Sequence, residues 1–333
     1  MYNNHFKAFL VTEKENGSYT QSITTRRFDE LPQNEVLINV KYSSLNYKDA
    51  LSATGHKGVT KKYPHTPGID ASGVVADSVD IRFKPGDEVI VTGYDLGMNT
   101  SGGFAEYISV PADWVVPLPN GLNLKEVMMF GTAGFTAAYA LHKMIECGQT
   151  TDSGPVLVTG STGGVGSLAV VLLSHAGFEV IAATGKPDAH SYLKNLGASQ
   201  IIDRSEVNDN SGKPLLRWKW AGAIDTVGGN LLSTVLKACK AHGNVAAMGN
   251  VLSTEVHTTV FPFILNGINL LGVDSATCPM SVRKLLWEKL AGEWKPAKLE
   301  QIAITASLES LKEYIPKILR GGMTGRILID LSQ

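Results

Sequence analysis

The sequence predicts an α/β protein with two domains, one rich in short β-strands and one built on a doubly wound parallel sheet. Two patterns and one motif carry this prediction. The first third alternates short apolar runs with turn residues, and from residue 155 onward strands alternate with helices. A glycine-rich turn joins the first strand of that second region to its first helix. A length of 333 residues exceeds one ordinary core and suits two domains.

The β-rich region extends to about Leu122. Turn signals such as Pro67-Gly68, Pro85-Gly86-Asp87 and Gly102-Gly103 separate its expected strands. Many short strands with Gly and Pro punctuation predict a compact, barrel-like β domain. The strands are expected at 36–40, 73–76, 88–92 and 105–110.

Between the β-rich region and the alternating region, the sequence predicts an Ala-rich helix from Glu126 to Lys143, broken or kinked around Gly131 and Gly134. The alternation that follows predicts a mostly parallel sheet covered on both faces. Strands are expected at 155–159, 180–183, 201–202, 223–227, 245–248 and 270–273, and helices at 167–176 and 190–196. A helix (308–319) and a strand (326–331) should return to the first domain. The expected domains are therefore 1–122 with 296–333, and 123–295.

Composition excludes several classes of function. Thirty Lys and Arg nearly balance thirty-one Asp and Glu, so neither nucleic acid nor an anionic membrane is the expected partner. No apolar run is long enough to span a membrane, and the leading residues lack the pattern of a secretory signal. The three cysteines are widely spaced, which favours a reducing cytoplasm over a disulfide framework.

The stretch from Gly160 to Gly166 has the context of a dinucleotide-binding turn, because it follows an apolar strand and opens a helix. Its spacing is G-x-x-G-x-x-G with an extra glycine, rather than the standard G-x-G-x-x-G. Small residues allow a tight turn and let a pyrophosphate approach the N–H groups at the helix N-terminus. The alternative is a glycine-rich turn that binds nothing.

The end of the next strand favours NADP(H) over NAD(H). NAD enzymes place Asp or Glu there to hold the ribose hydroxyls, whereas this strand ends in Thr184, Gly185 and Lys186. Lys186, with Arg204 after the third strand, suits a 2′-phosphate. The alternatives are that both are ordinary solvated cations, or that a longer strand brings Asp188 to the ribose. Asn250, at a later strand end, is a candidate for the nicotinamide side.

Several motifs together resemble the medium-chain dehydrogenase/reductases, in their zinc-free quinone-oxidoreductase-like part and above all the acrylyl-CoA reductases. The similarity spans essentially the whole chain. It rests on the order and spacing of the glycine turn with residues 43–50, 67–70, 131–137, 220–228, 262–265 and 272–275.

This resemblance implies a GroES-like β-rich domain formed by both chain ends and a six-stranded Rossmann domain between them, with the cofactor in the cleft. It also implies a homodimer joined through edge strands, for which residues 269–273 are the candidate. The implied NADP contacts are Tyr47, Thr162, Gly163, Gly164, Val165, Thr184, Gly185, Lys186, Arg204, Asn250, Ile264 and Ser275.

The same resemblance implies that no metal is bound. Alcohol dehydrogenases of the superfamily hold zinc with Cys and a His-Glu pair, but here Asn46 stands at the first position and Gly68-Ile69-Asp70 lacks the His. No C-x-x-C occurs for structural zinc. Asp70 is then ambiguous and could be structural.

The expected reaction is reduction of a carbon–carbon double bond next to a carbonyl, with hydride passing from NADPH to the β-carbon of an enoyl thioester or enone. Tyr47 is the candidate that donates the α-proton or orders the donating water, and Asn46 the candidate that holds the oxyanion or orients the substrate. Tyr47 could instead only pack on the nicotinamide. Lys48 and Asp49 could form a local ion pair.

Three questions stay open at this level. The substrate could be acrylyl-CoA, giving propionyl-CoA, or a quinone, and the protein could also be an NADP-binding protein without catalysis. Cations at the cleft mouth would favour a CoA substrate. The sequence offers Lys57, Lys61, Lys62 and Arg283 for its phosphates without selecting among them.

Overall fold

The computed structural model describes residues 5–332, so residues 1–4 of the leading stretch and Gln333 lie outside the description. The chain forms two compact units. The first contains the residues up to Thr132, Ala276–Ala291 and the residues from Leu299 onward, and the second contains Ala133–Ser275 and Gly292–Lys298. The domain limits expected at 122/123 and 295/296 stay a prediction. No helix among residues 5–332 is long and apolar enough to cross a membrane.

The first unit is built on a hairpin and a seven-stranded sheet. The hairpin pairs β1 (His5–Glu13) with β2 (Tyr19–Arg27). The sheet runs in the order β14-β15-β3-β4-β5-β7, and β6 also pairs with β3. Its strands are β3 (Val36–Leu45), β4 (Asp70–Ser78), β5 (Glu88–Thr92), β6 (Tyr107–Val110), β7 (Val116–Pro117), β14 (Ala303–Ser307) and β15 (Arg326–Asp330). Strand β15, near the C-terminus, therefore lies between β14 and β3 in a sheet formed mainly by N-terminal strands.

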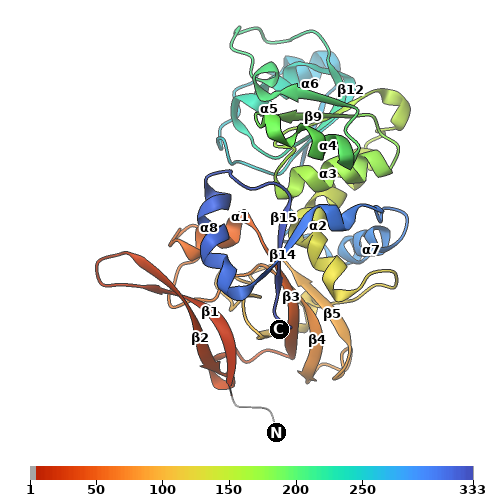
Figure 1. The fold of residues 1–333 in the computed structure, drawn as a ribbon. Coiled ribbons are helices and arrows are strands. Elements are labelled where there is room, and N and C mark those ends of the chain that lie inside the picture. The colour runs from red at the N-terminus through yellow and green to blue at the C-terminus, as the bar shows by residue number, and fades with distance from the viewer. Residues whose placement is uncertain (1–4, 333) are drawn as a thin grey trace. The chain divides into compact units, whose positions relative to one another are not determined.

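Alternating burial explains why β3 forms part of this sheet. Val36, Ile38 and Val40 are all buried, while the residues between them are half-buried, which is the period-two pattern of a strand with one core face. Helix α1 (Tyr47–Ala53) follows β3 after one residue and packs against α8 (Leu311–Leu319), as Figure 1 shows. The unit also contains α7 (Met280–Ala291).

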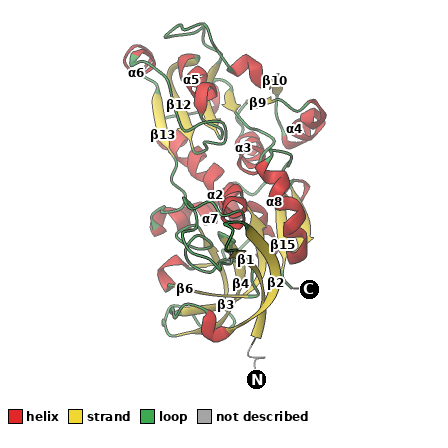
Figure 2. Cartoon of the chain, turned by 90° about the vertical axis from the view of Figure 1, so that its left-hand side faces the viewer, coloured by secondary structure: helices red, strands yellow, loops and turns green. Residues whose placement is uncertain are grey.

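The second unit is a six-stranded parallel sheet in the order β10-β9-β8-β11-β12-β13. This is the doubly wound order in which the direction of strand addition reverses at the centre, here between β8 and β11. The strands are β8 (Val156–Val158), β9 (Val180–Thr184), β10 (Gln200–Asp203), β11 (Trp220–Asp225), β12 (Cys239–Ala247) and β13 (Asn269–Gly272). The helices are α3 (Gly164–His175), α4 (His190–Leu196), α5 (Gly229–Lys237) and α6 (Phe261–Asn266), together with the part of α2 (Leu124–Glu146) from Ala133 onward. Figure 2 shows them in red around the yellow strands.

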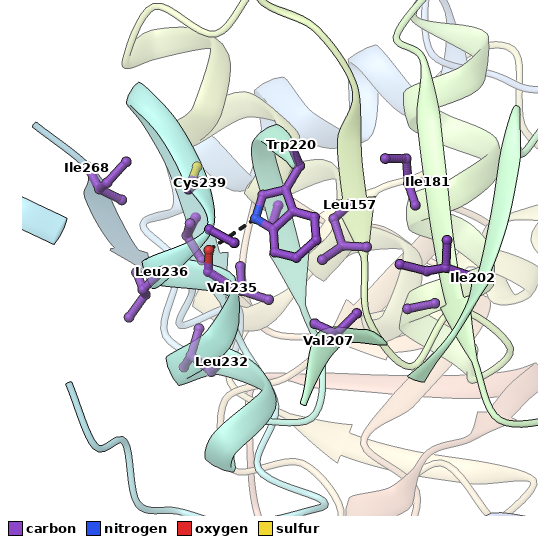
Figure 3. Close-up of a cluster of buried hydrophobic side chains, with 14 residues drawn as sticks. Leu157, Ile181, Ile202, Val207, Trp220, Leu232, Val235, Leu236, Cys239 and Ile268 are labelled. Carbon is purple, nitrogen blue, oxygen red and sulfur yellow. Dashed lines mark hydrogen bonds between the residues drawn. The ribbon is translucent and has the colours of Figure 1, made fainter. Parts of the chain in front are cut away.

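Strand register sets the core of this unit. Ile181, Leu157, Ala223 and Val245 are Cα partners across four neighbouring strands, so their side chains form one row on one face of the sheet. α5 packs its buried face on that row, around the fully buried Trp220. Figure 3 shows the indole N–H of Trp220 pointing to the Val235 carbonyl, which it reaches at 3.0 Å.

The sequence located most elements of the second unit, and the expected fold class is confirmed. The expected break in the helix from Glu126 is present, because Gly131 has non-helical angles inside α2 (Leu124–Glu146). The helix expected at 308–319 begins as a 3-10 turn, and its α-helical part starts at Leu311. The sequence did not predict the β1–β2 hairpin, β7, β14, α1, α5, α6 or α7.

Candidate functional site

The glycine turn between β8 and α3 lies where the strand order reverses, at the carboxyl ends of the strands. Gly160 has a φ of +57°, and a Cβ there would lie 2.4 Å from the Thr226 hydroxyl oxygen. A Cβ on Gly166 would lie 2.2 Å from the Gly160 carbonyl oxygen. The turn therefore needs glycine at both positions. Of the predicted contacts, Thr162 precedes α3, Gly163 is its N-cap, and Gly164 and Val165 are its first two residues. The first N–H groups of a helix have no acceptor within it.

A buried carboxylate fixes the neighbouring loops. Asp225, at the end of β11, accepts hydrogen bonds from the Thr159 hydroxyl at 2.7 Å and from the Gly228 N–H at 2.7 Å. Thr226 in turn donates its hydroxyl to the Thr159 carbonyl at 2.9 Å. Burial raises the pKa of Asp225, and these donors oppose the rise. The ends of β8 and β11 are thus held together beside the glycine turn.

Lys186 follows β9 and Arg204 follows the neighbouring strand β10, while residues 184–186 include no carboxylate. Strand β9 stops at Thr184, and Asp188 lies exposed in a separate 3-10 turn (Pro187–Ala189), so a longer strand does not bring it to this position. A Cβ on Gly185 would lie 2.8 Å from Nε of Arg204, which shows that the Arg204 side chain lies across Gly185. Half-burial lowers the pKa of Lys186. This local arrangement suits a phosphate monoester.

The other predicted cofactor contacts of this unit are spread over three segments. Asn250 is exposed in the loop after β12, and that loop is tied to the loop after β11 by the Leu252 N–H, which donates to the Val227 carbonyl at 2.9 Å. Ile264 lies on α6 with 68% of its surface exposed. The Ser275 hydroxyl accepts a hydrogen bond from Thr136 at 2.7 Å.

Asn46 and Tyr47 belong to the first unit, at the N-terminus of α1. Asn46 is the N-cap, and its side-chain amide is engaged at every polar atom. Its nitrogen donates to Asp70 Oδ2 at 2.8 Å, and to Asp49 Oδ2 and the Ser44 carbonyl at 3.2 Å each. Its oxygen accepts from Arg326 Nη1 at 3.0 Å. Tyr47 is half-buried, and within residues 5–332 its hydroxyl has no hydrogen-bond partner.

Asp70 is the centre of a buried network that the sequence did not reveal. Its carboxylate accepts from the Ser44 hydroxyl at 2.6 Å and from both the N–H and the hydroxyl of Thr132. The Arg326 guanidinium lies 3.6 Å from Asp70 Oδ2. Asp70 is fully buried and Arg326 is 3% exposed. In the sequence, the one indication of this buried cation is an arginine at the start of the otherwise apolar strand expected at 326–331.

Asp49 completes the network. Its carboxylate accepts from the backbone N–H groups of Asn46 at 2.7 Å and Ile69 at 2.8 Å. Burial, reinforced by the negative charge of Asp70, raises the pKa of Asp49 to about 7. The local ion pair with Lys48 is not formed, because Asp49 is buried and bonded to these other partners.

These residues do not fit a zinc ion at the positions where the superfamily binds one. Asn46 offers an amide rather than a thiolate, and the Asp70 oxygens already accept hydrogen bonds from four donor groups beside a guanidinium. Among the described residues, no three His, Cys, Asp or Glu side chains form a group that could hold a metal ion.

The candidate cations for CoA phosphates differ in availability. Arg283 is buried, donates to the Thr92 carbonyl at 2.8 Å and to the Ala276 carbonyl at 3.0 Å, and lies over the Tyr94 ring. It is a packing residue in this structure. Lys57 pairs with Glu13 at 2.6 Å. Lys61 and Lys62 are exposed.

Family models match two parts of the chain. Residues 32–120 match the model described as alcohol dehydrogenase GroES-like domain, and residues 164–291 match the model described as zinc-binding dehydrogenase.

Individual proteins match nearly the whole chain. The chain is 45% identical to the "Putative quinone oxidoreductase YhfP" of Bacillus subtilis, over 97% of this chain and 98% of that protein. It is 43% identical to the acrylyl-CoA reductase AcuI of Ruegeria pomeroyi, over 98% and 99%.

Solved structures also match nearly the whole chain. The B. subtilis yhfP structure with NAD bound superposes with a TM-score of 0.96 at 44% identity, covering 98% of this chain and 99% of that one. The yhdH oxidoreductase of Salmonella enterica in complex with NADP gives 0.95 at 39% identity, covering 98% and 100%.

Proposed function

We propose that this chain, which belongs to the quinone-oxidoreductase-like family of the medium-chain dehydrogenases/reductases, is an NADPH-dependent reductase of an activated carbon–carbon double bond. The preferred substrate is acrylyl-CoA or another short enoyl-CoA. The glycine turn, the end of β9 and the predicted contacts Asn250, Ile264 and Ser275 bind the cofactor, and Tyr47 acts at the substrate.

The observation that carries the cofactor assignment is the Arg204 side chain lying across Gly185, the residue before Lys186, in a segment (184–186) that contains no carboxylate. Both cations suit the 2′-phosphate that distinguishes NADPH from NADH. One relative was crystallised with NAD and another with NADP. The local charge in this chain favours the second kind of cofactor.

The substrate assignment is supported by the R. pomeroyi relative, which is named an acrylyl-CoA reductase and aligns from end to end. Bound NADPH supplies a hydride to the β-carbon, and the electron pair of the double bond moves to the α-carbon and carbonyl oxygen as an enolate. The reaction is completed when the α-carbon takes a proton. The Tyr47 hydroxyl, which has no partner within residues 5–332, gives that proton directly or through water.

The role of Asn46 is narrower than a direct contact with the oxyanion. Its amide is fully engaged by Arg326, Asp70, Asp49 and Ser44, so we assign it to holding the α1 N-terminus rather than to the substrate. Asn46 is the N-cap of α1, so it determines the position of Tyr47, the first residue of that helix.

The second candidate function is NADPH:quinone reduction, favoured by the name of the B. subtilis relative. The burial of Arg283 removes one proposed phosphate contact for CoA and adds weight to this alternative. Lys61 and Lys62 remain exposed cations on the first unit.

One experiment separates the two. NADPH consumption is followed with acrylyl-CoA and, separately, with a simple quinone, for the wild type and Tyr47→Phe. We expect turnover of acrylyl-CoA and a fall in kcat of about 100-fold in the variant, the lower end of general-acid contributions. Turnover of the quinone alone would contradict the CoA assignment, and an unchanged variant would limit Tyr47 to packing.

A homodimer and a cytoplasmic location complete the proposal. β13 is the outer strand of its sheet, and Leu270 on it and Leu265 on α6 are 42% and 63% exposed. An exposed apolar edge strand favours pairing with a second copy of the chain, which light scattering after size-exclusion chromatography would test. The three cysteines are all free thiols, as expected in a reducing compartment.

A further inference from the structure

A buried ionic cluster in the first unit is not explained by cofactor or substrate binding. We call it the Arg326 cluster, and it consists of Ser44, Asn46, Asp49, Asp70, Thr132 and Arg326. Its members come from the end of β3, the start of α1, the start of β4, the kink of α2 and the start of β15. Four stretches of the sequence, at 44–49, 70, 132 and 326, therefore meet in one buried cluster.

The charge balance of the cluster depends on Arg326. Asp49 and Asp70 are fully buried, and a buried carboxylate without a cation is strongly destabilising. Burial lowers the pKa of Arg326 while the two carboxylates oppose the change, and a guanidinium keeps its proton in proteins. Arg326 is thus a permanent internal cation.

The guanidinium also has a directional role. Nη1 donates to the Leu45 carbonyl at 3.2 Å and to Asn46 Oδ1 at 3.0 Å, and Nη2 donates to the Ser44 hydroxyl at 2.6 Å. With its oxygen held by Arg326, the Asn46 amide turns its nitrogen to Asp70 and Asp49. Asp49 then accepts the Asn46 N–H and closes the first turn of α1.

The chain makes room for this cation at Gly131. A Cβ there would lie 2.5 Å from Asp70 Oδ2, 2.5 Å from the Ser44 hydroxyl oxygen and 2.7 Å from Arg326 Nη2. Gly131 also has a φ of +51°, which interrupts α2 and lets the next residue, Thr132, donate to Asp70. The kink in α2 and the buried cation are therefore parts of one arrangement.

We propose that Arg326 is a positioning residue for the reaction: its guanidinium holds the Asn46 amide and, through it, the helix turn that carries Tyr47. The inference rests on the proposed function only in assigning Tyr47 to the substrate, whereas the ordering of α1 is independent of the substrate.

The test compares Arg326→Met and Arg326→Lys with Arg320→Met, an exposed arginine after α8 that serves as the matched control. Hydrogen exchange of residues 44–54, NADPH affinity by fluorescence and kcat are measured for each. We expect Arg326→Met to exchange α1 amides about tenfold or more faster and to lose about 100-fold in kcat. Arg320→Met should match the wild type.

The lysine variant separates charge from geometry. It keeps the positive charge but cannot hold Leu45, Asn46 and Ser44 together, because an ammonium lacks the planar fork of donors. We expect Arg326→Lys to regain thermal stability relative to Arg326→Met while α1 still exchanges fast. Added guanidinium ion at millimolar concentration, but not sodium at equal ionic strength, should slow the exchange of an Arg326→Ala variant.

Two results would overturn the proposal. The first is a hydrogen-exchange rate of residues 44–54 in Arg326→Met equal to that of the wild type. The second is a wild-type exchange rate and kcat in the double variant Asp70→Asn/Arg326→Met, which loses one charge of each sign. The double variant decides the matter if the single variant fails to fold, because it removes both charges. If the wild type reduced neither acrylyl-CoA nor the quinone, the proposed function would fail, while the exchange of α1 would still decide the role of Arg326.

Discussion

A methyl group at Gly185 tests the cofactor assignment without replacing a charged residue. The ideal Cβ of Gly185→Ala would lie 2.8 Å from Nε, 2.9 Å from Cδ and 3.3 Å from Cζ of Arg204. Gly185 is exposed and is not among the glycines with positive φ, so alanine meets no backbone strain there. The long, exposed Arg204 side chain has to move away, and the fold should keep its stability.

The magnitude follows from the lost contact. A hydrogen bond between a guanidinium and a phosphate contributes about 1.5–3 kcal/mol, and about 1.4 kcal/mol is a factor of ten in affinity. Gly185→Ala should therefore weaken NADPH binding about 10- to 100-fold. NADH carries no 2′-phosphate, so its dissociation constant should not change.

Fluorescence titration of both cofactors measures the two dissociation constants, with thermal unfolding as the check on stability. Arg204→Ala and the double variant Gly185→Ala/Arg204→Ala complete a thermodynamic cycle. Because the alanine acts through Arg204, the double variant should bind NADPH no more weakly than Arg204→Ala alone. Equal weakening of NADPH and NADH, or additive losses in the cycle, would refute the reasoning.

Three further predictions concern the stability of the two units. Trp220→Ala should lower the free energy of unfolding by about 3–5 kcal/mol, because it empties a fully buried site. Urea unfolding measures this loss. A loss below about 1 kcal/mol would contradict the prediction and mean that the neighbouring core residues fill the cavity. The pKa of Asp49 is raised to about 7 in the folded protein, against about 3.9 unfolded, so the folded state binds the extra proton between these values. The free energy of unfolding should consequently fall as pH rises from about 4 to 7 and level off above, by up to about 4 kcal/mol; the difference between the wild type and Asp49→Asn isolates this slope, and parallel pH profiles would contradict it. Gly131→Ala should destabilise the first unit by several kcal/mol, because the methyl group would collide with Asp70 and Arg326 and because the backbone conformation there favours glycine. Limited proteolysis should then cut first in the first unit. A thermal unfolding curve like that of the wild type would count against this prediction.

The sequence by itself determined the fold class, most of the parallel sheet and the place of the cofactor turn. These features have local signatures: strand and helix periods, turn residues, and glycines at positions such as Gly160 and Gly166 that leave no room for a side chain. The absence of a carboxylate at Thr184–Lys186 is equally local, and it favoured NADP(H) before any tertiary contact was known. The β1–β2 hairpin was missed because its second strand has no buried residue to mark a period.

Only the tertiary structure decided how distant residues meet. Arg326 donates to the carbonyl of Leu45, 281 residues away, because β15 pairs with β3 in one register that brings Ile327 opposite Leu45. The same structure buried Arg283, which the sequence left as a candidate for phosphate binding, and occupied the amide of Asn46. Local sequence patterns indicate which residues face a core. The partner of a buried charge depends instead on strand register and on which distant segments come together, and the residues next to it in the sequence indicate neither.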